Sequence, residues 1–392
     1  MSVTESLLLD PARAYSIEDR EPAAVRFRHF PALDGLRGVA VLAVMACHLE
    51  LLLPELHPAI QGGFLGVDIF FVLSGFLITS ILLSEQDATG TIDLKNFFIR
   101  RFLRLGPALW FFLICLYLAG DFLLPANESR IIYKNGDFFY AFFYLMNWHQ
   151  AYGNGEAGEL NHTWSLAIEE QFYIIWSLVL YKAFSSHMTR RLIAGVVGGS
   201  IILLLIWRAF RAATVSELNV IYYSTDTRID ALLIGCLASM IYCWRLVPAD
   251  VFVSAQFRLA AGIAPILALA IYFEFNHHDV LLYIGTLSVF SASIAVIILS
   301  LVTRQRSIMH KFLENRLLIW IGRISYSLYL WHYCLYVFSR TLSSSPLVQG
   351  AVGILLAVAV SCLSYYLIER PILKIKDRFT VKTGSSLQTV NS

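Results

Sequence analysis

The sequence is poor in charged residues. Asp, Glu, Lys and Arg together make up 15% of its 392 residues, against roughly 25% in an average soluble domain. Hydrophobic residues make up 57%, and the net charge is only +2. This composition excludes an ordinary soluble domain, and no basic run of the kind that binds nucleic acid is present. The chain is therefore expected to lie in a lipid bilayer.

Cysteine is also scarce, with six residues in the whole chain. All six fall within apolar segments, and their spacing matches neither a disulfide framework nor a zinc site. We interpret them as small packing residues and expect no bound metal. They are Cys47, Cys115, Cys236, Cys243, Cys334 and Cys362.

Long apolar runs, in contrast, are abundant. About ten segments are hydrophobic enough to cross a bilayer as helices. They cover residues 33–53, 64–83, 105–124, 164–183, 192–210, 229–244, 259–274, 280–302, 324–341 and 349–368. The sequence thus predicts an all-α, polytopic membrane protein with about ten transmembrane helices.

Basic residues mark alternate loops of this arrangement. Residues 84–104 and 303–323 are rich in Lys and Arg, whereas residues 54–63 and 275–279 contain neither. Loops that carry Lys and Arg stay in the cytoplasm. The alternation therefore predicts that both ends of the chain are cytoplasmic.

The same pattern divides the chain into three parts. Residues 1–30 lack the apolar core of a signal peptide and are expected to form a cytoplasmic tail. Residues 31–370 form the transmembrane domain, and the polar residues 371–392 form a second, disordered cytoplasmic tail. The outward loop 125–163 contains an apolar stretch, 138–148, which is too short to span. We expect this stretch to lie along the outer surface or to fold back into the bundle.

The first two apolar segments contain the ionisable residues Arg37, His48 and Asp68. Such groups are costly in lipid, and they usually face a protein interior or a water-filled cavity. Arg37 and His48 are separated by about three helical turns, so they share one helix face about 16 Å apart. In an antiparallel hairpin, Asp68 would lie at the depth of His48. A cation, a histidine and a carboxylate in this order suggest a reaction centre that spans the membrane.

A basic amphipathic segment follows at residues 94–104. Its composition favours a helix that lies at the membrane surface. The alternative is a phosphate clamp, because guanidinium groups bind phosphate oxygens in a bidentate fork. Its candidate ligands are Arg100, Arg101 and Arg104.

Two further segments carry polar groups inside apolar runs. Glu169 and Glu170 are adjacent, so only one of them is expected to face the bundle interior. Either carboxylate could instead be a structural group satisfied by a neighbour. An ion pair within one helix or between two helices would account for Arg228 and Asp230 without a catalytic role. A lone histidine on an apolar helix, such as His332, is more often packed than catalytic, and it ranks below His48.

Taken together, these segments resemble the acyltransferase 3 family of bacterial integral membrane acyltransferases. Five ordered blocks between about residues 30 and 370 carry the resemblance. They are Asp34-Gly-Leu-Arg37-Gly with His48, Gly66-Val-Asp68-Ile-Phe-Phe-Val-Leu-Ser74-Gly-Phe-Leu, Arg100-Arg101 with Arg104-Leu-Gly-Pro107, Trp164-Ser-Leu with Glu169-Glu-Gln-Phe-Tyr173, and Tyr326-Ser-Leu-Tyr-Leu-Trp-His332.

The resemblance implies a donor site and a catalytic base. An acyl-CoA donor, most simply acetyl-CoA, would bind from the cytoplasm with its phosphates near Arg37, Arg100, Arg101 and Arg104. The 16 Å between Arg37 and His48 is comparable to the reach of its pantetheine arm. His48 would then act as general base on the acceptor hydroxyl or carry the acyl group transiently.

The resemblance also implies supporting residues. Asp68 or Glu169 would orient the His48 ring and stabilise its protonated form. Weaker candidates for substrate binding are Asp34, Ser74, Glu170, Arg228, Asp230 and His332.

Family members of this kind lie in the bacterial inner membrane and acylate sugars outside the cytoplasm. The expected acceptor is therefore a glycan such as lipopolysaccharide O-antigen or exopolysaccharide. Acylation of a small natural product is the alternative within the same enzyme class. A transporter or flippase with a polar path is the alternative outside it, but the sequence shows no internal symmetry and clusters its arginines at one face.

Overall fold

The computed structural model describes residues 29–123, 136–153, 158–215, 217–303, 307–376 and 379. Throughout these residues the regular structure is helical, which confirms the all-α prediction. The long helices are α2 (Pro31–Leu49), α4 (Gly66–Thr89), α5 (Leu94–Leu123), α9 (Trp164–Ser185), α10 (Arg190–Thr214), α12 (Thr225–Cys243), α13 (Ala255–Glu274), α14 (Leu287–Thr303), α17 (Ser325–Ser339) and α18 (Pro346–Ser364).

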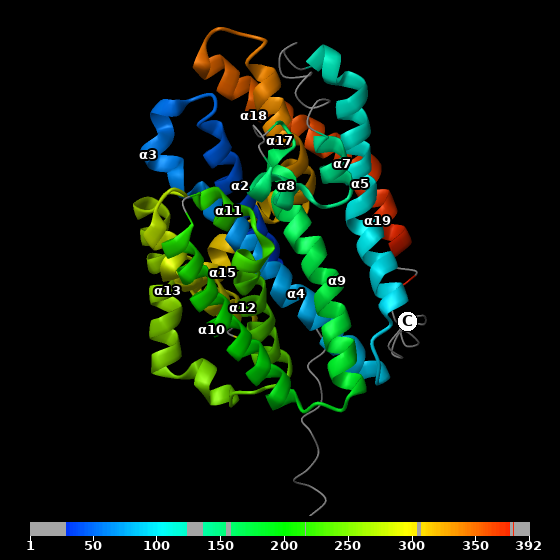
Figure 1. The fold of residues 1–392 in the computed structure, drawn as a ribbon, viewed down its shortest axis with the longest axis vertical. Coiled ribbons are helices and arrows are strands. Elements are labelled where there is room, and N and C mark those ends of the chain that lie inside the picture. Colours follow the sequence, from blue (N-terminus) through cyan, green and yellow to red (C-terminus); the bar gives the residue numbers. More distant parts are fainter. Residues whose placement is uncertain are drawn as a thin grey trace, which may run out of the picture.

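Short helical elements connect the long ones. They are η1 (Pro54–Leu56), α3 (His57–Ile60), η2 (Gln61–Leu65), α7 (Asp137–Phe142), α8 (Met146–Tyr152), η3 (Asn161–Thr163), α11 (Leu218–Tyr223), η4 (Ala249–Val253), η5 (Leu282–Thr286), α15 (Ile308–Leu313), α16 (Arg316–Arg323), η6 (Tyr365–Glu369) and α19 (Arg370–Lys376). In Figure 1, α9 lies in front, between α5 on one side and α10 and α12 on the other.

Each expected span corresponds to one long helix. Within the described residues, seven helices are long and apolar enough to cross a membrane. The remaining three expected spans are α9, α12 and α17. Ionisable side chains interrupt α9 and α12, and α17 has only 15 residues. All three helices that fall short of this hydropathy criterion carry candidate site residues, as α2, α4 and α5 also do.

The centre of the bundle is the crossing of α4 and α12, the most extensive helix contact in the described chain. Two glycines allow the close approach, since a Cβ at Gly75 would lie 1.9 Å from the Leu232 carbonyl oxygen. A Cβ at Gly235 would lie 2.1 Å from the Val72 oxygen. Small residues at such crossings let helix backbones pack closely in membranes.

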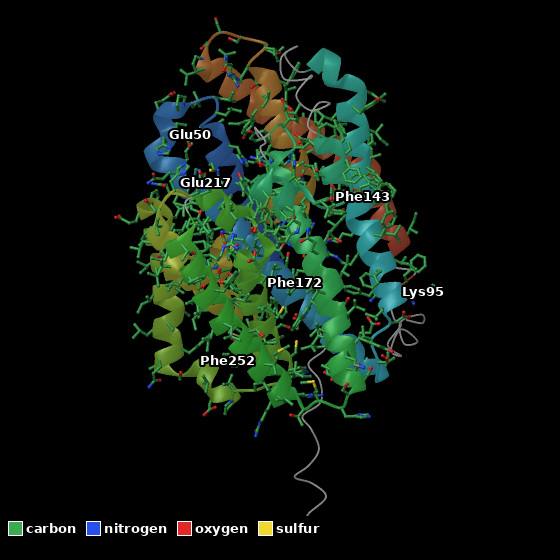
Figure 2. All side chains as sticks on the ribbon, viewed as in Figure 1. Glu50, Lys95, Phe143, Phe172, Glu217 and Phe252 are labelled. Carbon is green, nitrogen blue, oxygen red and sulfur yellow. The ribbon has the colours of Figure 1, made fainter. Side chains whose placement is uncertain are left out.

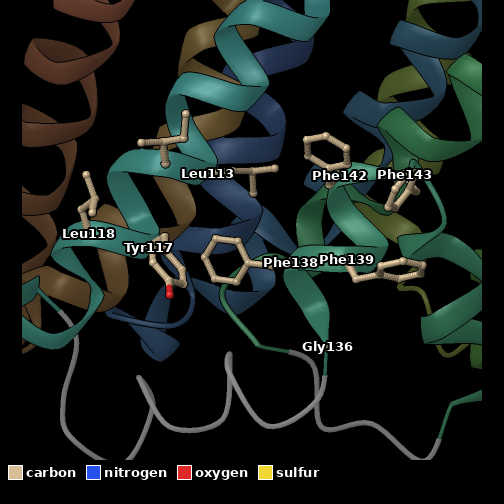
Figure 3. A pocket seen from close by; sticks show the side chains of 9 residues that line it. Leu113, Tyr117, Leu118, Gly136, Phe138, Phe139, Phe142 and Phe143 are labelled. Carbon is tan, nitrogen blue, oxygen red and sulfur yellow. The ribbon is translucent and has the colours of Figure 1, made fainter.

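The apolar stretch 138–148 forms parts of α7 and α8. Met146 and Asn147 are buried, and α8 packs on α9 and α11, so this part folds back onto the bundle. Phe139 and Phe143 are exposed. Together with the end of α5, α7 lines a hollow of about 440 Å³ whose side chains are nearly all apolar or aromatic (Figure 3).

The ends of the bundle agree with the expected alternation of loops. Glu50 and Glu217 lie in the upper part of the view in Figure 2, and Phe252 lies at the lower end. The expected alternation places the outer end of the first span, with Glu50, and the loop with Glu217 on one side of the membrane, and the loop with Phe252 on the other. Residues 1–28 of the first tail lie outside the described residues. The second tail was expected to start at residue 371, but helix α19 continues to Lys376. Most of the remaining tail also lies outside the described residues.

Candidate functional site

Two of the cavities that α2 lines contain candidate site residues. We call the first the arginine chamber; its volume is about 100 Å³, and it contains Arg37. We call the second the histidine chamber; its volume is about 370 Å³, and it contains His48. Arg37 and His48, about 16 Å apart along α2 by helix rise, therefore lie in different chambers.

Helices α2, α4, α9 and α17 line both chambers, but apart from Tyr329 they contribute different residues to each. The polar residues of the arginine chamber are Arg37, Ser74, Arg101, Arg104, Ser165, Glu169, Tyr173, Ser325, Tyr326 and Tyr329. The polar residues of the histidine chamber are Cys47, His48, Glu50, Asn161, His162, Tyr222, Tyr223, His277, Tyr329 and Tyr333, with Trp164 beside them.

His48 is paired with His332. The Nδ1 atom of His48 lies 2.8 Å from Nε2 of His332, and Nδ1 of His332 lies 2.9 Å from the Leu328 carbonyl oxygen. Because a carbonyl only accepts, Nδ1 of a neutral His332 carries the proton and its Nε2 accepts from His48. Nε2 of His48 is then left with a free lone pair. This hydrogen-bond chain leaves His48 with one defined nitrogen that is free to accept a proton.

A third histidine, His162, lies beside this pair and was not among the residues predicted from the sequence. Its ring centroid is 5.5 Å from that of His332, and its Nε2 is 3.0 Å from the Leu330 carbonyl oxygen. Nδ1 of His162 is buried without a hydrogen-bond partner in the described chain. Its position just before the Trp164-Ser-Leu block was the available signal.

At the mouth of the histidine chamber, the loop after α13 contributes His277. Burial, reinforced by the neighbouring His278, lowers the pKa of His277. At neutral pH this side chain is therefore uncharged.

The structure gives Asp68 a different partner from the one expected. Both of its carboxylate oxygens accept from Nη2 of Arg228, at 3.1 and 3.0 Å, and both side chains are fully buried. The rings of Phe71, Trp164 and Tyr222 surround the guanidinium at 5.1 to 5.8 Å, which suits a buried cation. Asp68 therefore holds α4 to α12, and the expectation that it orients His48 is not met, because His332 occupies that place.

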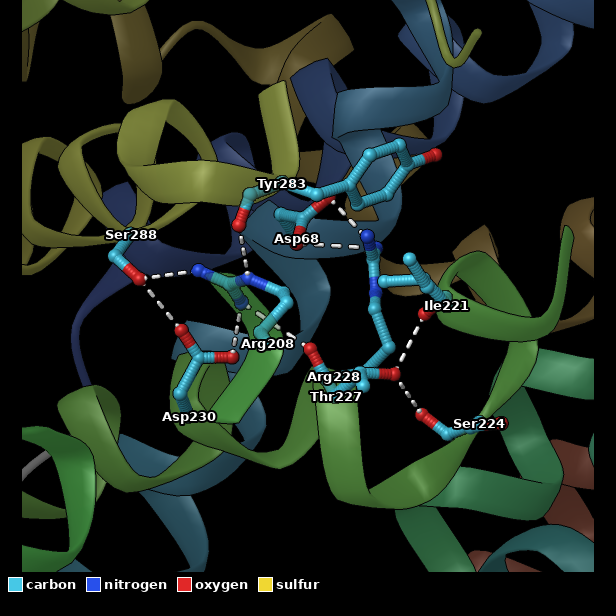
Figure 4. A network of polar contacts seen from close by, with 9 residues as sticks. All are labelled: Asp68, Arg208, Ile221, Ser224, Thr227, Arg228, Asp230, Tyr283 and Ser288. Atoms are coloured by element: carbon cyan, nitrogen blue, oxygen red, sulfur yellow. Dashed lines mark hydrogen bonds and ion pairs between the residues drawn. The ribbon is translucent and has the colours of Figure 1, made fainter. Parts of the chain in front are cut away.

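A second buried ion pair lies next to the first (Figure 4). Nη1 of Arg208 lies 2.7 Å from Oδ1 of Asp230, and Ser288 donates to Oδ2 of Asp230 at 2.7 Å. Nε of Arg208 donates to the Tyr283 carbonyl oxygen at 3.0 Å. Neither Arg228 nor Asp230 lines the two chambers, so the ion pairs that the sequence offered as an alternative explain both residues.

Three of the four expected arginines line the arginine chamber. Arg101 donates to Glu170 at 2.9 Å and stacks 3.7 Å above the centroid of the Tyr173 ring. Arg37 lies 3.6 Å from Asp34. In the described part of the chain, no carboxylate pairs with Arg104 within 4.0 Å. This leaves the Arg104 guanidinium available to an anion.

Arg100, in contrast, points away from the chamber. Its Nη2 pairs with the buried Glu85 at 2.7 Å, and its Nη1 donates to the Phe379 carbonyl oxygen at 2.8 Å. Arg100 thereby ties α4, α5 and the segment after α19 together. Arg100 therefore makes structural contacts, and the expectation that it contacts the phosphates of the acyl-CoA donor is not met.

Glu169 also lies in the arginine chamber, away from His48. Its Oε2 accepts from the Tyr173 hydroxyl at 2.9 Å, and Ser74 lines the same chamber. Glu169 is therefore placed to adjust the charge of the arginine chamber, and the expectation that it orients His48 is not met. A further carboxylate that the sequence did not single out, Glu369, accepts from Ser327 on α17.

The fold and the two chambers define a polytopic membrane protein that has arginines around one cavity and a pair of histidines at a second, an arrangement suited to group transfer. The comparisons name the class. The family model of the acyltransferase 3 family, described as an acyltransferase domain, matches residues 30–366. The chain belongs to this family of acyltransferases.

Individual relatives agree with this assignment. The chain is 34% identical over 359 residues to the peptidoglycan O-acetyltransferase OatA of Listeria monocytogenes, covering 88% of this chain and 56% of the relative. It is 36% identical over 360 residues to O-acetyltransferase OatA of Staphylococcus aureus, covering 88% and 58%. The chain thus spans little more than half the length of these relatives. No solved structure matches it.

Proposed function

We propose that the chain is a membrane O-acetyltransferase that moves an acetyl group from acetyl-CoA to a hydroxyl of a cell-surface glycan. The observation that carries the proposal is that α2 lines both the arginine chamber and the histidine chamber. The first offers cations to an anionic donor. The second offers a base whose free nitrogen is defined by its hydrogen bonds.

In this proposal, the arginines hold the donor. Arg37 and Arg104 contact phosphate oxygens of coenzyme A at the cytoplasmic side, where bidentate guanidinium contacts are strong. Arg101 is already paired with Glu170, so it contributes mainly charge. The pantetheine arm then runs along α2 and brings the thioester toward His48.

His48 performs the proton transfer. Its Nε2 takes the proton of the acceptor hydroxyl while the hydroxyl oxygen attacks the thioester carbon. The C–S bond then breaks, and His48 returns the proton to the sulfur of coenzyme A. His332 fixes the ring and its tautomer throughout, as an orienting residue does in other histidine-based sites.

The acceptor is inferred to be a glycan of the cell wall. The similar proteins are named O-acetyltransferases, one of them for peptidoglycan. The aromatic and amide lining of the histidine chamber, including Asn161 and Tyr223, offers hydrogen bonds and flat surfaces that suit a sugar.

The test uses the full chain in proteoliposomes that enclose soluble peptidoglycan strands. Acetyl-CoA labelled in the acetyl group is added outside. The proposal predicts labelled, base-labile esters on the enclosed glycan, and none with vesicles that lack the chain. If label crosses the membrane only as intact acetyl-CoA, the chain is a transporter and the proposal is wrong. Absence of both outcomes would also overturn it.

A further inference from the structure

Tyr329 is the one described residue that lines both chambers. It lies on α17 one turn before His332, and it is buried, with 5% of its surface exposed. Its ring faces the wall of each cavity, at 6.3 Å from the Phe70 ring and 5.6 Å from the His162 ring. Phe70 lines the arginine chamber and His162 the histidine chamber.

The Tyr329 hydroxyl is held from both sides. It donates to the His162 carbonyl oxygen at 2.6 Å, and it lies 2.6 Å from Oγ of Ser165. Since the single Tyr329 proton goes to the carbonyl, Ser165 is the donor to the Tyr329 oxygen. A chain of two hydrogen bonds thus runs across the boundary between the chambers.

We propose that Tyr329, fixed by Ser165 and the His162 carbonyl, is a movable partition that separates the donor side from the acceptor side. This inference rests on the proposed function for its purpose but not for its geometry. The arginine chamber has a volume of only about 100 Å³, which holds a few water molecules. An acyl-bearing arm therefore reaches His48 only when Tyr329 turns aside.

The partition has a chemical purpose. A thioester that is open to water on the acceptor side hydrolyses, and closed sites prevent such side reactions. Tyr329 would keep water of the histidine chamber away from the donor until the arm itself displaces the ring. It is thus a positioning residue, distinct from the base His48.

The structure supplies a probe for this partition in Cys47, which lines the histidine chamber. With the other cysteines replaced, the anionic thiol reagent 2-sulfonatoethyl methanethiosulfonate is added to sealed vesicles from the arginine side. In the parent protein, labelling of Cys47 from this side is slow. Labelling from the opposite side should proceed at the same rate in every variant and serves as the measure of correct folding.

The variants form a graded series. Ser165→Ala removes one hydrogen bond and should speed labelling from the arginine side about fivefold. Tyr329→Phe removes both hydrogen bonds but keeps the ring, and should speed it about 25-fold. Tyr329→Ala removes the ring and should label at least as fast as Tyr329→Phe. Tyr242→Phe, on α12 and away from both chambers, should match the parent.

Equal labelling rates in the parent, Ser165→Ala and Tyr329→Phe would overturn the partition, whatever the fate of Tyr329→Ala. A second readout is the release of coenzyme A from acetyl-CoA when no glycan is present, which should rise in the same order relative to transfer. If the parent makes no acetyl ester at all, the proposed function fails, and the labelling series still decides the partition.

Discussion

Replacing His332 by phenylalanine tests the pairing on which the mechanism is built. The His332 ring is fully buried, so phenylalanine retains its shape and packing while removing the nitrogen that accepts from His48. The Nδ1–H group of His48 is then left unpaired in the bundle. A buried donor without a partner costs about 1–3 kcal/mol.

If that cost falls on the reactive state, kcat drops by roughly 5- to 150-fold. The KM for acetyl-CoA should stay close to that of the parent, because the arginine chamber is untouched. His332→Gln, whose side-chain oxygen accepts a hydrogen bond, should recover part of the lost kcat.

The assay measures initial rates of acetyl transfer in proteoliposomes at several acetyl-CoA concentrations, with membrane abundance as the control. A His332→Phe protein with parental kcat would show that His332 does not orient His48. A loss confined to KM would point to donor binding instead.

Three further predictions follow from the site. Asp68→Asn should lower the free energy of unfolding by about 3–5 kcal/mol, because it leaves Arg228 as an uncompensated buried charge. Thermal unfolding in detergent measures this loss, and an unchanged melting temperature would contradict the ion-pair assignment. Arg104→Ala should weaken binding of acetyl-CoA more than Arg100→Ala does, as titration calorimetry would show, because only Arg104 faces the chamber; the reverse order would refute the chamber as the donor site. A cysteine at Gln150 in a protein whose native cysteines are replaced should react with an impermeant reagent in intact cells, and reaction only after the cell membrane is permeabilised would reverse the topology.

Much of the fold could be predicted from the sequence because lipid imposes a simple rule. A transmembrane helix must satisfy its backbone polar groups with its own hydrogen bonds and expose apolar side chains to the lipid. Runs such as 192–210 therefore predict a transmembrane helix unambiguously. The shared face of Arg37 and His48 was also predictable, since both lie on one helix whose geometry is fixed.

The partners of the buried polar groups were not predictable in the same way. Asp68 lies on a helix that is apolar and buried around nearly its whole circumference, so periodicity does not say which face meets which neighbour. Its depth in the membrane alone allowed Asp68 to pair with either His48 or Arg228. The crossing at Gly75 and Gly235 decides for Arg228, and that contact joins segments far apart in the chain.

The same holds for the histidine pair. His48 and His332 are separated by 284 positions, and nothing local to either residue indicates the other. Tyr329 was part of a quoted sequence block, but its place between two cavities is a property of the assembled bundle.

The most direct test of the central claim is acetyl transfer by His48→Asn. Asparagine is polar and of similar reach, but it does not titrate, so it cannot take the proton of the acceptor hydroxyl. We predict that transfer to enclosed glycan is nearly abolished, while membrane abundance and acetyl-CoA binding remain close to those of the parent. Parental rates of transfer by His48→Asn would remove His48 from the chemistry and leave His162 and His332 as the candidates for the base.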